Sequence, residues 1–301
     1  MTTVIECSPI SIKSSPDLKA VKSKQQTAWS SGDYAVIGTT LQIVGEQLAE
    51  ALDLRAGNSV LDIAAGNGNA TLAAARRWCN VTSTDYVEAL LARGRERAAA
   101  EGLRVDFQIA DAEHLPFADG SFDAVVSTFG AMFSPDQDNT ASEMLRVCKS
   151  GGKIGLANWT PEGFIGQMFK TIGKYLPPPA GVKSPALWGT REWIEKTFGA
   201  KDSGTKDSGT KDSGTKDSGA KASQIVARPR MFNFRYRSAQ HFLDLVRKYY
   251  GPMLKAFEAL DAAGQAGLAR DIIALIGRMN VATDGTMVVP GEYLEVVITR
   301  R

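Results

Sequence analysis

A pair of closely spaced glycines has the type and spacing of a binding turn. Gly66 and Gly68 lie in the stretch VLDIAAGNGNAT (60–71), between an apolar run and an Ala-rich segment. Glycine tolerates positive φ and lets a ligand approach the backbone, and a helix that begins at such a turn offers unpaired N–H groups. The stretch therefore predicts a strand, a glycine turn and a helix that bind a nucleotide-type ligand.

Three acidic residues fall at the predicted carboxyl ends of the first three strands. Asp62 lies within the first strand, Asp85 directly after the second and Asp111 directly after the third. A carboxylate about twenty residues beyond such glycines can accept hydrogen bonds from both hydroxyls of a ribose. Asp111 would reach an adenine amine, and Asp62 would neutralise an ammonium. The three acids predict a ligand with an adenosine at one end and a cationic amino group at the other.

Alternating strands and helices must position these residues. The predicted strands cover residues 60–64, 81–84, 105–110, 122–127 and 153–159, and the predicted helices between them cover residues 70–77, 87–100 and 141–148. This rhythm predicts an α/β fold, a Rossmann-like doubly wound sheet with five parallel strands and ligands at their carboxyl ends. Two late strands, at residues 224–236 and 293–299, would join the sheet edge, and the late helices would form a cap.

Composition restricts the partners of the chain. Its 301 residues are 44% hydrophobic and carry a net charge of +2, whereas nucleic-acid binding normally needs a strong basic excess. No stretch approaches the roughly 18 apolar residues of a membrane span. The three cysteines have no metal-ligand or redox spacing, so the sequence predicts no metal site and a reducing, cytoplasmic compartment.

Several motifs together resemble a known family. In chain order they are VLDIAAGNGNAT (60–71), TSTDY (82–86), ADAEHLPFADGSFDAVVSTFG (110–130) and EMLRVCKSGGKIGLANW (143–159). Their order and spacing resemble the class I S-adenosylmethionine-dependent methyltransferases, and most of all the ubiquinone/menaquinone-biosynthesis-like, or type 11, group. The resemblance is specific over residues 60–159 and loose over 224–301. It implies methyltransferase activity, S-adenosylmethionine as cofactor and a small-molecule methyl acceptor as partner.

The resemblance also implies roles for the matched positions. The methionine moiety of the cofactor would be held by Asp62, Ala64, Gly66, Gly68 and either Ser127 or Thr128. The adenosine would be held by Asp85, Tyr86, Asp111 and Ala112, with Glu113 and Leu115 nearby. Trp29 and Tyr34 belong to the N-terminal segment that caps this site in the family.

The domain organisation follows from these matches. Residues 1–20 are rich in Ser, Pro and Lys and are predicted to be disordered, and residues 21–160 form the S-adenosylmethionine-binding core with an N-terminal cap helix. Residues 161–301 supply substrate-cap helices and the closing strands. A loop at 201–221 interrupts them with KDSGT repeats. These repeats lack large apolar side chains and are predicted to be disordered.

The sequence identifies no catalytic residue. A sulfonium methyl is already activated, so catalysis requires mainly an oriented, desolvated acceptor. Of the two histidines, His114 is expected in a surface or supporting role, and His241 would begin a cap helix where it could face the crevice. Aromatic residues after the fourth strand and in the later segments favour an apolar or aromatic acceptor.

Three alternatives stay open at this level. A nicotinamide-dependent dehydrogenase shares the glycine turn, but Thr71 replaces its third glycine and the dehydrogenase leaves Asp111 unexplained. A non-catalytic S-adenosylmethionine sensor or assembly factor would have the same binding motifs. A protein methyltransferase is a further alternative, although a lid built from residues 160–300 suits a small acceptor better.

Overall fold

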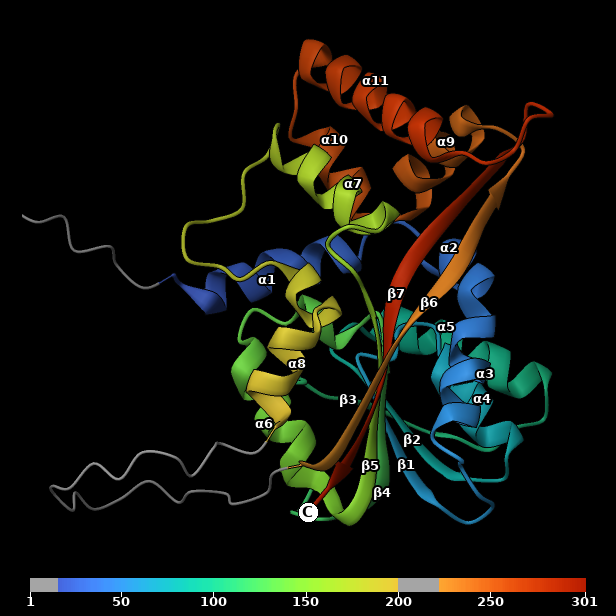
Figure 1. The fold of residues 1–301 in the computed structure, drawn as a ribbon, viewed down its shortest axis with the longest axis vertical. Helices are drawn as coiled ribbons and strands as arrows, with labels where there is room; N and C mark the ends of the chain where they lie inside the picture. The colour runs from blue at the N-terminus through green and yellow to red at the C-terminus, as the bar shows by residue number, and fades with distance from the viewer. Residues whose placement is uncertain (1–15, 200–221) are drawn as a thin grey trace, which may run out of the picture.

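The computed structural model describes residues 16–199 and 222–301, which form a seven-stranded sheet, helices on both its faces, and a helical cap (Figure 1). The strands are β1 (Ser59–Ile63), β2 (Asn80–Asp85), β3 (Asp106–Ile109), β4 (Phe122–Thr128), β5 (Cys148–Trp159), β6 (Ala222–Tyr236) and β7 (Met287–Arg300). The helices of the first half are α1 (Leu18–Trp29), α2 (Ala35–Gly38), α3 (Gln42–Ala51), α4 (Asn69–Arg76), α5 (Glu88–Ala100) and α6 (Gln137–Val147). The later helices are α7 (Phe164–Gly173), α8 (Arg191–Phe198), α9 (Ala239–Tyr249), α10 (Gly251–Glu258) and α11 (Ala262–Met279). Short 3-10 turns are η1 (Thr39–Leu41), η2 (Ala131–Phe133) and η3 (Pro185–Gly189).

The sheet has the strand order β3-β2-β1-β4-β5-β7-β6. Strands β1 to β5 are parallel, whereas β7 is antiparallel to β5 and β6 is antiparallel to β7. This confirms the predicted doubly wound sheet with two late strands at one edge. The order reverses between β1 and β4, and sheets of this kind bind ligands in the crevice outside the strand ends at that reversal.

Strand β1 is mainly apolar and lies between β2 and β4 in the sheet. Val60, Leu61 and Ile63 are fully buried because helices cover both faces of the strand. Figure 1 shows α3 and α4 on one face of the sheet and α6 and α8 on the other. The Ala-rich face of α4 packs against the sheet together with Leu48 of α3. Because these buried strands are parallel, their carboxyl ends lie together at one edge of the sheet.

The cap lies beyond those carboxyl ends. Helices α7, α9, α10 and α11 gather there, and the long ribbon of β6 and β7 extends toward them (Figure 1). Helix α1 contacts α10, and a Cβ on Gly251 would lie 1.9 Å from the carbonyl oxygen of Ala28, so the two helices meet closely. None of the helices in the described ranges has the length and hydrophobicity needed to cross a membrane.

Among the predicted boundaries that are wrong, three have a clear physical reason. Helix α1 begins at Leu18, capped by the Asp17 side chain, so residues 18–20 are helical where the sequence predicts disorder. Helix α6 ends at Val147 and β5 starts at once, because Cys148 is extended and pairs with Phe122 across an irregularity in the ladder. Strand β7 runs from Met287, well before residue 293, because it pairs with β6 along its length despite Pro290.

Two predictions of disorder cannot be compared with the structure. Residues 1–15 and the repeat loop at 201–221 lie outside the described residues.

Candidate active site

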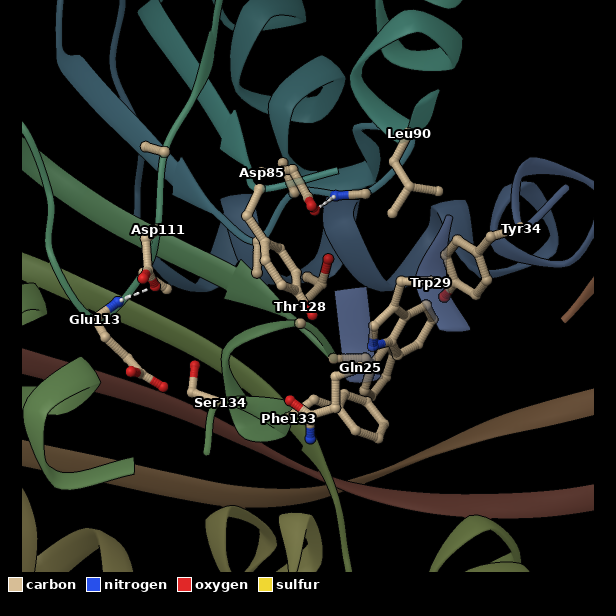
Figure 2. Close-up of a pocket in the computed structure, with 18 of the residues that line it drawn as sticks. Gln25, Trp29, Tyr34, Asp85, Leu90, Asp111, Glu113, Thr128, Phe133 and Ser134 are labelled. Carbon is tan, nitrogen blue, oxygen red and sulfur yellow. Dashed lines mark hydrogen bonds between the residues drawn. The ribbon is translucent and has the colours of Figure 1, made fainter. Parts of the chain in front are cut away.

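A cleft opens at the carboxyl ends of β1 to β4, where the strand order reverses. Its empty volume, including the open mouth, is about 820 Å³, within the range of small-molecule sites. Among its lining residues, those predicted from the sequence are Ala64, Gly66, Asp85, Tyr86, Asp111, Ala112, Glu113 and Thr128, together with Trp29 and Tyr34. Figure 2 shows Asp111 and Glu113 on one side of the cleft, with Trp29 and Tyr34 on the other.

The glycine turn forms the floor of this cleft. Ala64 and Gly66 have φ of +50° and +57°, and both line the cleft. Gly68 does not line it, but with φ of +85° it turns the chain into α4. Positive φ is costly for alanine, by about 1–3 kcal/mol, and such strain clusters at ligand sites. The turn therefore presents backbone to the cleft.

Asp85 joins the turn to the end of β2. Its Oδ2 accepts the Gly66 N–H at 2.9 Å, and its Oδ1 accepts the Val87 N–H at 2.9 Å. Burial raises the pKa of Asp85 to about 6 despite these two hydrogen bonds. Each oxygen keeps lone-pair capacity, so the carboxylate can accept two further donors from a ligand.

Lys22 of α1 reaches across the cleft to two carboxylates. Its Nζ donates to Asp111 Oδ2 at 2.6 Å and also pairs with Glu113 Oε2. Although burial opposes the shift, the Lys22 ammonium and the Glu113 N–H hold the pKa of Asp111 below its ordinary value. Both contacts leave Asp111 ionised at neutral pH and hold α1 over the cleft, where Gln26 also donates to the Tyr86 carbonyl at 2.8 Å.

Asp62 and Ser127, like Gly68 and Leu115, do not line the cleft. Asp62 is fully buried beneath the turn, where its Oδ2 accepts the Thr71 N–H at 2.8 Å and the Thr71 hydroxyl at 2.6 Å. Burial raises its pKa to about 7. Ser127 donates to the Ile63 carbonyl at 2.7 Å and accepts the Ala131 N–H. The two side chains therefore brace the loops, and Thr128 is the residue of the Ser127/Thr128 pair that faces the ligand space.

A second strained residue, Phe129, lines the cleft at the end of β4. Phe129 has φ of +58° and follows β4 directly. Gly130 packs so closely that a Cβ there would lie 2.1 Å from the Ala64 carbonyl oxygen. The loops after β1 and β4 are thus in backbone contact, and Phe129 is directed toward the space under the cap.

An apolar chamber adjoins the cleft there. Its empty volume, including space open to solvent, is about 500 Å³, and it shares Trp29, Tyr34, Phe129 and Phe133 with the cleft. The remaining walls come from α2, η1, β5, α7, β6, α9 and the residue between α9 and α10. They are Ile37, Leu41, Trp159, Ile165, Met168, Phe234, Phe242, Val246 and Tyr250. Phe129 stacks on Trp159 with centroids 3.9 Å apart. The chamber is therefore an aromatic compartment opening onto the cleft.

Neither histidine lines the cleft or the chamber. His114 is exposed, and its Nδ1 lies 3.7 Å from Asp111 Oδ2. His241 accepts the Arg237 N–H at the start of α9. Asp111, Glu113 and His114 bring possible metal-ligand atoms within 4.8 Å of one another, but the Lys22 ammonium already pairs with both carboxylates.

Sequence reasoning missed several lining residues, among them Lys22, Asn67, Asn69 and Gly130. Lys22 is one lysine among several in an N-terminal segment, and only the packing of α1 brings it to Asp111. Gly130 carried a usable signal, because a glycine close to the end of a buried strand often marks close backbone approach.

The fold and cleft define a doubly wound α/β protein in which acids at two neighbouring strand ends line a cleft. Residues 60–152 match the protein family described as "Methyltransferase domain". The uncharacterized protein Rv1405c of Mycobacterium tuberculosis is 35% identical over 277 residues, covering 91% of this chain and 93% of that protein. Rv1403c of the same organism is 45% identical over 172 residues, but the match covers 56% of this chain and only 63% of that relative. The solved structure of YcgJ from Bacillus subtilis shares the fold, with a TM-score of 0.51 and 18% identity over 88% of this chain and 99% of that chain.

The chain belongs to the class I S-adenosylmethionine-dependent methyltransferases, and S-adenosylmethionine is its cofactor. This displaces the nicotinamide alternative, while membership of the type 11 group stays a prediction. The residues present fit the cofactor: Asp85 and Asp111 offer acceptors for hydroxyl and amine donors, and aromatic faces stand where the cleft meets the chamber. Aromatic faces attract cations, which suits a sulfonium.

Proposed function

We propose that this protein transfers the methyl group of S-adenosylmethionine to a small apolar or aromatic acceptor. The observation that carries the proposal is the pair of adjoining spaces, a polar cleft and an aromatic chamber that share four lining residues. A cofactor in the cleft would have its reactive end at those shared residues. An acceptor in the chamber would then meet the methyl group away from bulk water.

Residues of the cleft would hold the cofactor in this proposal. Asp85 would accept the ribose hydroxyls, Asp111 and Ala112 would contact the adenine edge, and the backbone of Ala64 and Gly66, with Thr128, would hold the amino-acid end. Asp62, Gly68 and Ser127 would act through the loops that they brace. Tyr86 would lie beside the adenine.

When bound, S-adenosylmethionine supplies an activated methyl group on a positively charged sulfur. The chain contributes binding, orientation and exclusion of water. Trp29 and Phe133, with ring centroids 5.2 Å apart, flank the junction between the two spaces. Holding two reactants in line inside a dry site can supply a large part of the rate enhancement without an acid or base.

Untargeted mass spectrometry tests the function directly. Metabolite extracts are incubated with the protein and a deuteromethyl-labelled donor, and products heavier by one labelled methyl group are sought. Wild-type protein should label at least one small apolar compound, and Asp85→Ala should not. Cofactor binding without any labelled product would instead support the non-catalytic sensor, and labelled protein without labelled metabolites would support a protein methyltransferase.

A further inference from the structure

The chamber contains no side chain that can accept a proton at neutral pH. Its lining has no Asp, Glu, His, Lys, Arg or Cys among the described residues. The charged groups of the adjoining cleft are Lys22, Asp85, Asp111 and Glu113. Two of these carboxylates are paired with Lys22, and Asp85 accepts two backbone N–H groups. We therefore expect the nucleophilic atom of an acceptor to be deprotonated before the acceptor enters the chamber.

Two tyrosine hydroxyls interrupt the apolar lining. Tyr34 lines both spaces and Tyr250 lines the chamber, and their ring centroids are 6.1 Å apart. Burial, with the neighbouring Tyr236 phenol, raises the pKa of Tyr34 to about 12, and burial beside Tyr34 raises the pKa of Tyr250. Neither hydroxyl bonds to another described residue, unlike Tyr293, which donates to Gln47. Both phenols stay protonated and can donate to an anionic oxygen.

We propose that the acceptor is an apolar molecule with an acidic phenol or enol hydroxyl, which binds as its anion and receives hydrogen bonds from Tyr34 and Tyr250. The inference rests on the proposed methyl transfer. The hydroxyl proton is lost to water before binding. An electron pair of the phenolate or enolate then forms a bond to the methyl carbon, the carbon–sulfur bond breaks, and its electron pair remains on sulfur as a neutral thioether.

Charge and chemistry favour this acceptor over other nucleophiles. An ammonium would bring a second positive charge next to the sulfonium and would find no base to remove its proton. An alcohol has the same need for a base. A thiolate would use the two O–H donors poorly, because sulfur is a weak hydrogen-bond acceptor. An oxygen anion beside a sulfonium neutralises charge as it reacts, which an apolar enclosure favours.

The first experiment compares acceptors of similar size. The full chain is incubated with labelled S-adenosylmethionine and either 4-hydroxycoumarin, an acidic enol, 2-naphthol, a weakly acidic phenol, or 2-(aminomethyl)naphthalene, whose amine is an ammonium near neutral pH. The rate with 4-hydroxycoumarin should be flat from about pH 6 to about pH 9, the rate with 2-naphthol should rise about tenfold per pH unit, and the amine should not react. Faster transfer to the amine, or a flat profile with 2-naphthol, would overturn the inference.

The second experiment removes one donor. Tyr250→Phe should raise KM for 4-hydroxycoumarin about tenfold or more without lowering kcat, because the lost hydrogen bond stabilises the bound anion. Its affinity for S-adenosylmethionine should not change, since Tyr250 lines only the chamber. Tyr249→Phe is the matched control, because Tyr249 lines neither space. A lower kcat with unchanged KM in Tyr250→Phe would contradict the proposed role.

The two levels of proposal fail differently. N-methylated or S-methylated products from cell extracts would contradict the proposal that the acceptor carries an acidic hydroxyl, but they would support the methyltransferase function. A protein that binds S-adenosylmethionine but labels neither the probes nor any extract component would sink the function itself.

Discussion

Replacing Asp85 by asparagine removes the charge and one acceptor oxygen from the end of β2 while keeping the size of the side chain. In the native protein one oxygen accepts the Gly66 N–H and the other accepts the Val87 N–H, both at 2.9 Å. Each oxygen therefore has capacity for one ribose hydroxyl. In the variant the amide NH2 opposes one of those N–H groups, and only one oxygen remains for the ribose.

The expected loss follows from the bonds removed. A hydrogen bond to a charged group contributes about 1.5–3 kcal/mol, and the remaining bond becomes a weaker, neutral one. A loss of about 3 kcal/mol raises Kd about a hundredfold. Isothermal titration with S-adenosylmethionine at about pH 7.5 measures it, because Asp85 with a pKa of about 6 is ionised there.

Asp62→Asn is the matched control. Asp62 is as deeply buried as Asp85, but it holds Thr71 and does not line the cleft. Its Kd for the cofactor should change by less than about tenfold, since the asparagine oxygen can still accept from Thr71. Thermal melting without cofactor establishes that both variants are folded. Equal losses of affinity in the two variants, or an unchanged Kd in Asp85→Asn, would refute the assignment of the ribose to Asp85.

Three further outcomes are expected. Burial raises the pKa of Asp62 to about 7 and that of Asp85 to about 6, above the ordinary value of 3.8 in the unfolded chain. Both carboxyls therefore stabilise the cofactor-free fold at low pH, and this contribution is lost as the pH rises from about 4 to about 7. Urea unfolding at about pH 4 and about pH 7 measures how far the free energy of unfolding declines. The decline should be smaller in Asp85→Asn by up to about 3 kcal/mol, and an equal decline in variant and wild type would contradict the raised pKa of Asp85. Lys22→Met removes the ammonium that pairs with Asp111 and Glu113; hydrogen exchange in α1 should accelerate and cofactor dissociation should speed up by about three- to tenfold, whereas unchanged exchange would show that α1 is held otherwise. Gly130→Ala places a methyl 2.1 Å from the Ala64 carbonyl oxygen, so it should lower both the melting temperature and cofactor affinity, and native values of both would mean that the two loops separate freely.

Much of the core could be predicted from the sequence because its signals are local. The central parallel strands β1 and β4 are short, mainly apolar runs followed by a turn, and β2 is a short run with β-branched residues that ends at an acid. Recognising such runs needs no knowledge of distant residues. Asp85 and Asp111 could be predicted for the same reason, since each directly follows a strand whose carboxyl end must meet the others. Predicted boundaries were wrong where hydrogen bonding between strands overrides the local sequence preference, as at Cys148 and Met287.

The sequence alone determined the doubly wound sheet, the position of the cleft and the class of cofactor, because these depend on glycine conformation and on residues fixed to strand ends. Only the tertiary structure separated Asp62 from Asp85, since the two acids have similar local signals and differ in what packs around them. It also decided that Lys22 spans the cleft and that tyrosines from two distant segments, Tyr34 and Tyr250, meet in one aromatic chamber. Contacts between segments so far apart along the chain depend on the packing of the cap on the sheet, which no local pattern encodes.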